Sequence, residues 1–513
     1  MAKNTENSSD ASKAHKPFSQ FMDDIKVTMR EMYRGEGGSE ILTLPRGVPP
    51  TVFSKFMPHN PLSVCIPAEN GGRGGKMHEI MAMVSAASYE SLPLSLTLGI
   101  NSALFIQPVA KYARPEVKDA VFGRFLKDKE MGGLMITEPD FGSDALNMQT
   151  YCVEKEHSYH LNGKKHWAGL TGSANFWLLT ARERTESGNL KRDMDFFVCD
   201  RSVQNQQIVV EEYFDNFGLH QIPYGRNIID VDIPKLQKLV PKTTGVNLLL
   251  DLLHRSRLQF PAMGLGFVQR MLDEAIEHCD QRIVGGKSLS SYDQVQFRLA
   301  RLQASYTIIS AMCLYSSENG GLEFDLHTSG LVPNSIKTIT TDLMQDAAQS
   351  LVQLIGAKAY KYSNIGARGI ADSRPFQIFE GSNDILYIQI AEAVLKLMKQ
   401  AGKNNLYEYL LTNNDTNKAT TSLKSALDFE LNLPISQRKL TDLGQVIAKI
   451  ISMQIVIDAA NKGFRNDLIE NALQILRKEI VGIMGSFVVK ESSIVIEDYT
   501  QNSYWFSMIK DRY

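Results

Sequence analysis

One carboxylate stands in the stretch of this 513-residue chain that is best suited to chemistry. Glu380 follows aromatic and β-branched residues, and burial among such residues raises the pKa of a carboxyl group toward about 6 to 7, which suits a general base. Gly381 allows close backbone approach, and Ser382 and Asn383 are helix-capping types. The pattern therefore predicts a helix that begins beside the carboxylate, and its amide-rich start can hold a phosphate or an oxyanion. A solvated capping residue is the alternative interpretation of Glu380.

The composition describes an ordinary globular protein. With 43% hydrophobic and 22% charged residues the chain is long enough for two to four packed units. A formal net charge of -2 supplies no overall basic field, so we expect no nucleic-acid partner. The five cysteines are scattered without a paired motif, which favours reduced thiols, a cytoplasmic location and no metal site; they are Cys65, Cys152, Cys199, Cys279 and Cys313.

Neither the N-terminal end nor any apolar run indicates a targeting or membrane segment. Residues 1–16 are polar and contain two acidic residues, so we expect a disordered tail and neither a secretory signal nor an Arg-rich transit peptide. No apolar run in the sequence approaches the roughly 18 residues of a membrane span.

Hydrophobic periodicity divides the body of the chain into three parts. Residues 17–131 have helical spacing, and residues 132–240 change to short β runs that predict a small barrel or sandwich. Within them Asn162-Gly163 is a strong hairpin-turn signal. Residues 241–402 return to long amphipathic helices, which predict a four-helix bundle. The fold class is therefore α+β, with the β domain between two helical domains.

Beyond the bundle, residues 403–422 are rich in Asn and Thr and are predicted to be a linker. Residues 423–513 form an extra helical region, in which residues 435–460 and 467–484 are two amphipathic segments. We favour packing on the body or a subunit contact for this helical pair, and regard contact with a membrane surface as the less favoured alternative.

Segments at the predicted domain junctions resemble those of the acyl-CoA dehydrogenase family, and they occur in the family's order over about residues 60 to 400. The segments are Thr-Glu-Pro-Asp-Phe-Gly-Ser-Asp at 137–144, Asn-Gly-Lys-Lys-His-Trp at 162–167, Asp-Val-Asp-Ile-Pro at 230–234 and Phe-Glu-Gly-Ser-Asn at 379–383. The resemblance implies the family's fold, FAD as cofactor, and abstraction by Glu380 of the α-proton of an acyl thioester while the β-hydrogen leaves as hydride to the flavin.

The resemblance also assigns the binding residues. It implies flavin or FAD contacts at seven positions, namely Thr137, Ser143, Trp167, Arg282, Gln353, Ser382 and Asp384, with Arg282 reaching the pyrophosphate across a subunit interface. It implies substrate contacts at Ser143, Arg257 and Gly381, with Arg257 near the CoA moiety. Taken singly, each of these could be a turn former, a core residue or a solvated charge.

The chain departs from the family pattern at several positions. Gly169 stands where dehydrogenases usually place threonine, and acyl-CoA oxidases resemble this chain there. Gly285, Asp293, Ala357 and Ala359 replace family residues on the adenosine side, and His254 stands where an acidic residue often meets the substrate. These departures leave open how tightly FAD binds and whether the thiol carrier is CoA or a carrier protein.

The sequence as a whole predicts an FAD-dependent acyl-CoA dehydrogenase that makes a trans-2-enoyl thioester. The resemblance implies a homodimer or a dimer of dimers and an electron-transfer flavoprotein as acceptor. Two alternatives stay open, an acyl-CoA oxidase that uses oxygen and a catalytically silent relative that serves as a binding or assembly subunit. The acyl chain length and branching do not follow from the residues.

Overall fold

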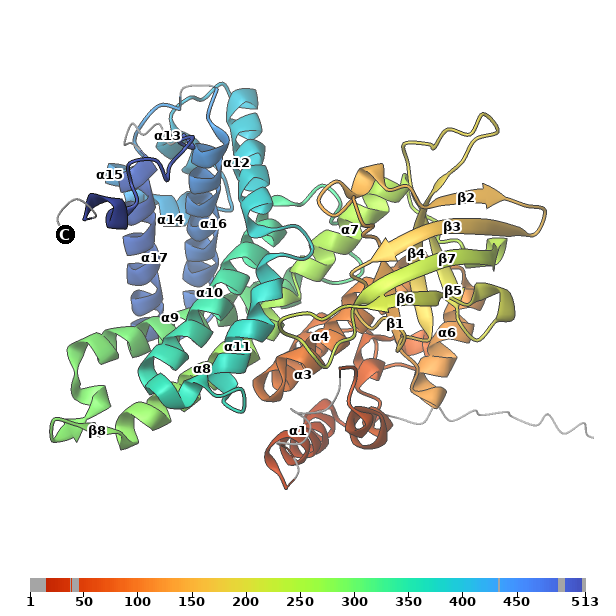
Figure 1. The fold of residues 1–513 in the computed structure, drawn as a ribbon, viewed down its shortest axis with the longest axis horizontal. Coiled ribbons are helices and arrows are strands. Elements are labelled where there is room, and N and C mark those ends of the chain that lie inside the picture. Colours follow the sequence, from red (N-terminus) through yellow and green to blue (C-terminus); the bar gives the residue numbers. More distant parts are fainter. Residues whose placement is uncertain (1–14, 37, 39–45, 432–433, 488–493, 510–513) are drawn as a thin grey trace, which may run out of the picture.

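The computed structural model describes residues 15–36, 38, 46–431, 434–487 and 494–509, so most of the predicted tail, residues 1–16, lies outside the described residues. A helical N-terminal region, a curled β-sheet, a helical bundle and a further helical region follow one another along the chain (Figure 1). The predicted fold class and the order of its parts are confirmed.

The N-terminal region packs its helices against one another and against the bundle. Its helices are α1 (Phe18–Arg34), α3 (Met77–Glu90), α4 (Leu92–Gly99), α5 (Gln107–Tyr112) and α6 (Pro115–Asp128), with a π-helical segment at Ile100–Ile106. The stripe predicted for α1 is present, since Phe21, Ile25, Met29 and Met32 are all buried. The long contact between α3 and α8 joins this region to the bundle.

The middle region is a seven-stranded sheet in the order β1-β4-β2-β3-β7-β6, with β5 paired to β4. Its strands are β1 (Gly132–Met135), β2 (Tyr151–Glu154), β3 (Ser158–His166), β4 (Phe176–Glu183), β5 (Asp195–Asp200), β6 (Val209–Tyr213) and β7 (Gly225–Pro234). Alternation of buried and exposed residues along β7 shows that one face of the sheet is packed and the other open. Trp167 directly follows the end of β3 that points toward the bundle (Figure 1).

The predicted turn at Asn162-Gly163 is wrong. Both residues lie inside β3 and pair with Asp230 and Ile229 of β7, and the reversal between β2 and β3 falls at residues 155–157. A Cβ atom on Gly163 would lie 2.3 Å from the Thr150 hydroxyl oxygen, so the glycine is required by close packing of neighbouring segments and not by a left-handed turn.

The bundle is built on α8 (Phe260–Gln281), α9 (Asp293–Asn319), α10 (Leu331–Ile355) and α12 (Asn383–Gln400), as the periodicity predicts. Two shorter helices, α7 (Gly245–Arg257) and α11 (Ile365–Ser373), complete it, and a small hairpin of β8 (Ile283–Val284) and β9 (Lys287–Ser288) joins α8 to α9. The last helix, α12, starts immediately after Gly381 and Ser382, so the segment that carries Glu380 is held between α11 and α12.

Residues 403–422 differ from the predicted linker. They contain α13 (Leu406–Leu410) and α14 (Asn417–Thr420), and the apolar side chains of Leu406, Leu410 and Ala419 are fully buried. The Asn and Thr residues cap and turn these short helices, as Asn405 does by accepting a hydrogen bond from the Glu408 amide at 3.0 Å. Composition suggested a solvated segment because the few apolar residues are far apart in the sequence.

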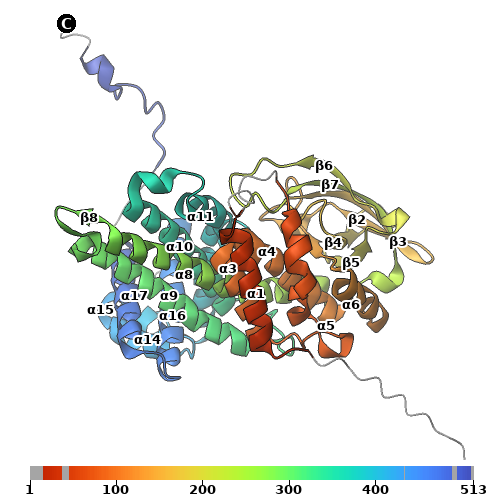
Figure 2. The ribbon, with the colours of Figure 1, turned by 90° about the horizontal axis from the view of Figure 1, so that it is seen from below.

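The extra helical region packs on the body. Beyond α15 (Lys424–Leu427), helices α16 (Gln437–Ala460) and α17 (Asn466–Phe487) form a hairpin, with α16 against α12 and α10 and α17 against α9. Figure 2 shows the hairpin beside α9, with the chain continuing beyond it as an extended segment.

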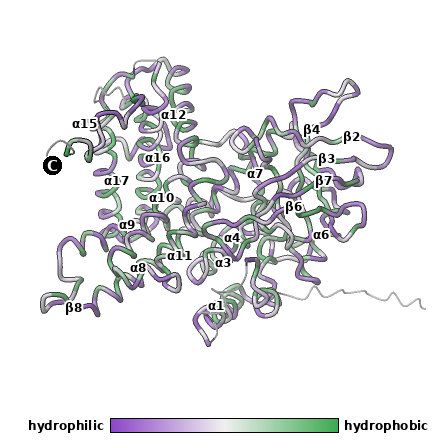
Figure 3. Tube along the Cα trace, viewed as in Figure 1, coloured by the Kyte–Doolittle hydropathy of each residue, from purple (hydrophilic) through white to green (hydrophobic). Residues whose placement is uncertain are grey.

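Two helical stretches are long and apolar enough to cross a membrane by length and composition, in contrast to the sequence expectation. They are residues 92–112 and α16. Most of each stretch is buried inside the structure, which is the behaviour of core helices. Hydrophobic residues recur along α10, α12 and α16 where these helices pack together (Figure 3).

Candidate active site

A cavity of about 440 Å³ lies where the β domain meets α4, α7 and the start of α12. Its apolar wall is formed by Leu96, Ile100, Leu104, Leu249, Leu253 and Phe379. The side facing the sheet carries Thr137, Gly142, Ser143 and Trp167, and Glu380 and Gly381 close the end at α12. A mainly apolar cavity with a few convergent polar groups is typical of a small-molecule site.

Glu380 brings an unused hydrogen-bond acceptor to this cavity. Its Oε1 accepts a hydrogen bond from the Ser256 hydroxyl at 2.9 Å, while its Oε2 is buried and has no protein partner. Burial raises the pKa of the Glu380 carboxyl group, and the positive charge of Arg257 partly opposes the rise. The carboxylate is therefore desolvated and has one free oxygen, as a general base requires.

The backbone at Glu380 is held in a conformation that side chains rarely adopt. Glu380 has φ 54° and Gly381 has φ 91°, so two successive residues lie in the left-handed region. Only a glycine accepts this region without cost, and strain at a non-glycine residue persists where surrounding contacts maintain it. Two buried cations supply such contacts.

Arg257 holds the first of the two carbonyls. Its guanidinium donates to the Glu380 carbonyl at 2.7 Å and to Asn334 Oδ1 at 2.6 Å. The Arg257 side chain is only 5% exposed, and burial lowers its pKa to about 10. The sequence assigned Arg257 to the CoA moiety, whereas in the structure its donors are directed to the turn that carries Glu380.

Lys337, on α10, holds the second carbonyl. Its Nζ donates to the Gly381 carbonyl and to Asn383 Oδ1, both at 2.9 Å. The side chain is fully buried, and burial lowers its pKa to about 7. Asn383 in turn donates to Asp342 at 2.7 Å, and Asp342 accepts from the Tyr387 hydroxyl at 2.6 Å. This network ties the turn to α10 and to the first two turns of α12.

Trp167 presents an aromatic surface to the cavity from the end of β3. It has φ 57° and is 51% exposed, although its ring packs 4.6 Å from the ring centroid of Phe214. Thr137 lies beside it, because the His166 amide donates to the Thr137 carbonyl at 2.8 Å. The half-exposed indole, Thr137 and the open turn at Gly142 and Ser143 together form a wall that a flat ring system can cover.

The turn that carries Thr137 is fixed by a buried ion pair. Lys165 Nζ lies 3.0 Å from Glu138 Oε1 and is completely buried, and burial lowers its pKa to about 8. Glu138 also accepts from the Gln149 and Thr150 amides. Since breaking such a pair leaves an uncompensated buried charge, Lys165 and Glu138 hold the wall of the cavity in place.

Four of the residues assigned by resemblance are not among the residues that line this cavity. Arg282 is exposed at the end of α8, next to β8, which Figure 1 places at the far end of the bundle from the sheet. Gln353 is exposed near the end of α10. Ser382 is the residue before α12 but makes no side-chain capping bond, and Asp384 is exposed in the first turn of α12.

Two of the positions that depart from the family pattern, Gly169 and His254, line the cavity. A Cβ atom on Gly169 would lie 2.8 Å from Ile100 Cδ1, so packing against the cavity wall favours glycine. His254 is buried, and its Nδ1 lies 2.7 Å from the Leu326 carbonyl oxygen. A carbonyl only accepts, so Nδ1 carries the proton, and burial lowers the pKa of His254 to about 4. His254 is therefore neutral.

Sequence reasoning missed Ser256, Asn334 and Lys337. Each touches Glu380, Gly381 or Arg257, yet lies 43 or more positions away from Glu380 in the sequence. Of the three, only Lys337 could have been noticed in the sequence, since it is a lone cation among apolar and hydroxyl residues on one helix.

Three family profiles match the chain in the order of its domains. They are the N-terminal domain of acyl-CoA dehydrogenase over residues 27–129, the middle domain over residues 133–231 and the C-terminal domain over residues 243–395. The fold and the site thus define a flavoprotein-type oxidoreductase. The chain belongs to the acyl-CoA dehydrogenase family.

Individual relatives are distant in sequence. An acyl-CoA dehydrogenase of Bacillus subtilis is 22% identical over 385 residues, covering 72% of this chain and 98% of that protein. A glutaryl-CoA dehydrogenase of Desulfococcus multivorans is 25% identical over 329 residues, covering 64% of this chain and 83% of that protein.

Solved structures extend the fold comparison. The butyryl-CoA dehydrogenase of Megasphaera elsdenii aligns with a TM-score of 0.64 and 19% identity, covering 74% of this chain and all of that one. An acyl-CoA dehydrogenase of Bacillus anthracis in complex with FAD aligns with a TM-score of 0.72 and 15% identity, covering 93% of this chain and 90% of that one. This fold likeness includes much of the extra helical region.

Proposed function

We propose that the protein removes the α-proton and the β-hydride of an acyl-CoA thioester to give the trans-2-enoyl thioester, with FAD as its cofactor. The observation that carries the proposal is the unpartnered, buried Oε2 of Glu380 at the end of an apolar cavity. FAD is supported by family membership and by the FAD complexes that share this fold.

The residues of this chain supply the acid–base part of the reaction. Oε2 of Glu380 takes the α-proton, while Ser256 holds Oε1 and fixes the direction of the free oxygen. Arg257 and Lys337 hold the Glu380 and Gly381 carbonyls. No hydrogen bond among the described residues uses the Glu380 amide, so it is left as a donor for the thioester oxygen. When bound, FAD supplies the acceptor for the hydride.

The cavity wall fits a flavin ring. The half-exposed Trp167 ring gives an apolar face, and Thr137 and Ser143 give hydroxyl groups at its edge. A single chain does not bring Arg282 and Gln353 to this wall. We propose that these two residues, with Asp384 and Ser382, serve the FAD of a second subunit in a homodimer or dimer of dimers. We retain the cytoplasmic location as part of the same proposal.

The proposed reaction needs an electron acceptor for the reduced flavin. One solved structure that shares this fold, at 21% identity, is named for the electron transferring flavoprotein of Acidaminococcus fermentans. We propose such a flavoprotein as the electron acceptor. An acyl-CoA oxidase is the second candidate, because Gly169 lies on the cavity wall; hydrogen peroxide formed on turnover in air would favour it. An apo protein that takes up no FAD would instead favour a silent assembly subunit.

The test is an anaerobic visible spectrum of the purified protein with a series of saturated acyl-CoAs of increasing length. We expect some acyl-CoAs to bleach the flavin band and Glu380→Gln to abolish the bleaching. Glu392→Gln is the control, because it removes an exposed carboxylate from α12, the helix that follows Glu380. Unchanged bleaching in Glu380→Gln would refute the assignment of the base, and flavin that no acyl-CoA bleaches would refute the proposed substrate.

A further inference from the structure

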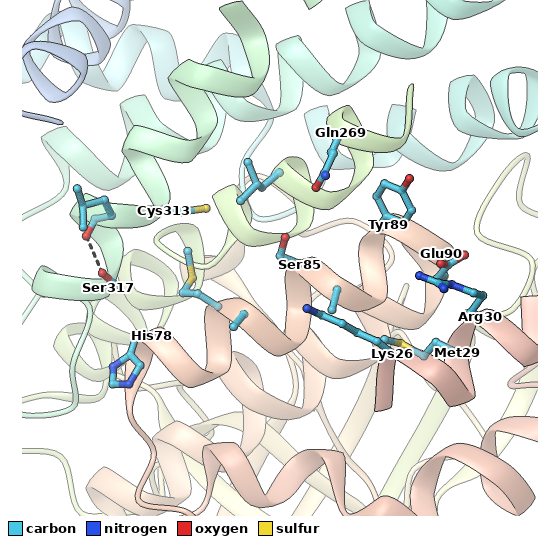
Figure 4. A pocket seen from close by; sticks show the side chains of 15 residues that line it. Lys26, Met29, Arg30, His78, Ser85, Tyr89, Glu90, Gln269, Cys313 and Ser317 are labelled. Atoms are coloured by element: carbon cyan, nitrogen blue, oxygen red, sulfur yellow. Dashed lines mark hydrogen bonds between the residues drawn. The ribbon is translucent and has the colours of Figure 1, made fainter. Parts of the chain in front are cut away.

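A second cavity, of about 480 Å³, forms an open groove over α3 and shares no lining residue with the catalytic cavity. One face of α3 is its floor, from His78 through Met81, Ala82, Ser85 and Ala86 to Glu90, and the residues recur at helical spacing. Met29 from α1 and Leu265 and Leu314 from α8 and α9 add apolar walls (Figure 4). The proposed reaction uses none of these residues.

The rim of the groove on the α1 side is basic. Lys26 and Arg30 are exposed and line the groove, and no carboxylate among the described residues forms an ion pair with either. Glu90, at the same end, is already paired with Arg34 at 2.7 Å and with Arg270 at 3.4 Å. Figure 4 shows Lys26 extending across the groove toward Ser85. The groove therefore suits an apolar chain that carries negative charge at one end.

A segment with these properties lies near the end of the same chain. In residues 494–499, Ile494 is 80%, Val495 94%, Ile496 69% and Tyr499 76% exposed, and Glu497 and Asp498 lie between the apolar residues. This segment stands off from the body (Figure 2). So large a set of exposed apolar side chains in one segment marks an interaction site.

We propose that residues 494–499 of one copy of this chain bind in the α3 groove of a second copy. His78 to Glu90 spans about 18 Å along the helix axis, and residues 494–499 can span about 20 Å once the turn at residues 497–499 is straightened. In an extended segment Ile494 and Ile496 share one side and lie over the floor at Met81 and Ala82. Glu497 and Asp498 meet Lys26 and Arg30.

The position of the segment favours a second copy over its own groove. It follows α17, whose last residue, Phe487, packs against Phe429 at 5.8 Å between ring centroids. Phe429 belongs to the region beyond α12, whereas the groove is bounded by α1 at the N-terminal side of the molecule. In Figure 2 the segment points away from α1 and α3.

Photo-cross-linking tests the contact directly in the full chain. A photoreactive phenylalanine derivative replaces Ile496 in unlabelled protein, which is mixed with wild-type protein labelled with ¹⁵N. We expect cross-linked peptides that join unlabelled residue 496 to ¹⁵N-labelled peptides of α1 or α3. Cross-links only within unlabelled chains would overturn the assignment to a second copy, and cross-links to other surfaces would overturn the groove.

Charge reversal tests the complementarity. We expect Lys26→Glu with Arg30→Glu to weaken self-association by about tenfold or more in sedimentation equilibrium, and Glu497→Lys with Asp498→Lys to do the same. Combining all four changes should restore most of the loss. Lys55→Glu with Lys127→Glu, two exposed lysines outside the groove, controls for the change in net charge. Equal loss in this control, or no recovery in the combined variant, would refute the pairing.

Discussion

Glu380 combines three features that are costly for a folded protein. Its carboxyl group is desolvated, one of its oxygens has no protein partner, and its backbone has a positive φ. Burying a charge without full compensation destabilises a fold. Such a site persists where neighbouring contacts outweigh the cost, and here Ser256, Arg257 and Lys337 provide them.

The raised pKa predicts the pH dependence of the reaction. The base acts only when it is ionised, so kcat/KM should fall about tenfold per pH unit below the pKa of Glu380, which lies above the ordinary value of about 4.3. The Ser256 hydroxyl bond lowers this pKa. Ser256→Ala should therefore move the acidic limb of the pH profile to higher pH. A limb that stays in place or moves to lower pH would contradict the assignment of Glu380 as the base.

The same shift predicts a change in stability. Because the folded-state pKa of this acid is raised, ionised Glu380 destabilises the fold, fully above the folded pKa and not at all below the unfolded pKa near 4.3. Glu380→Gln should raise the melting temperature at pH 8 and leave it nearly unchanged at pH 4. The measurement is thermal unfolding at both pH values, and a variant less stable than wild type at pH 8 would contradict the prediction.

Substitutions of Arg257 test whether this residue positions the turn that carries Glu380 or binds the CoA moiety. Arg257→Met leaves Asn334 Oδ1 and the Glu380 carbonyl without their donors, each at a cost of about 1 to 3 kcal/mol. We expect a lower denaturant midpoint together with lower kcat. Arg257→Lys, which keeps the charge, should lose less. A variant with wild-type stability and a raised KM alone would instead support the CoA contact assigned from the sequence.

At the scale of elements, α12 connects the turn that carries Glu380 to the extra helical region. Helix α16 packs closely against it, since a Cβ atom on Gly444 would lie 1.9 Å from the Tyr387 carbonyl oxygen. Tyr387 also bonds to Asp342 in the network below the turn. The position of α16 is therefore coupled to the turn that carries Glu380.

Two helical glycines test this coupling. Gly444→Ala forces α16 away from α12, and we expect a loss of about 1 to 3 kcal/mol in the free energy of unfolding and a lower kcat. Gly482→Ala lies on α17 with no atom within 4 Å of the added Cβ, so it should gain up to about 1 kcal/mol. Chemical denaturation of both variants checks this, and equal effects would show that the α12–α16 contact carries no strain.

At the scale of the molecule, residues 403–513 are part of the folded body. Helix α16 buries Leu443, Val446, Ile447, Ile450 and Ile451, and it packs against α12, α17, α10 and α9. The Megasphaera elsdenii structure aligns over its whole length with 74% of this chain. This chain therefore adds a second packed layer to a shared fold.

Removing that layer should be costly. A protein ending at residue 402 exposes Tyr387, Ile390 and Val394 of α12 to water, and burying each such side chain is worth about 1.5 to 3 kcal/mol. We expect this truncated protein to aggregate or to melt well below the full chain. Sedimentation and thermal unfolding measure both, and a soluble truncated protein with the melting temperature of the full chain would refute the interpretation.

The sequence by itself determined the fold class, the order of the domains and the family. Long helices have a strong hydrophobic period. Glu380, Trp167 and Thr137 lie in short segments whose order of residues is sufficient to show the resemblance to the family. Local turn and linker propensities were misleading where contacts with residues distant in the sequence outweighed them. Asn162-Gly163 forms no turn because both residues pair with β7. Residues 403–422 form no open linker because Leu406 and Leu410 are buried.

Tertiary structure alone decided which groups surround the Glu380 carboxylate. Ser256, Asn334 and Lys337 come from α7 and α10, far from Glu380 in the chain, and no local pattern indicates that they meet. The tertiary structure also directs Arg257 to the Glu380 carbonyl oxygen and places Arg282 and Gln353 away from the cavity. Burial, which raises the pKa of Glu380 and lowers that of Lys337, is a property of the packed state, because the desolvation that causes it exists only once the helices have assembled.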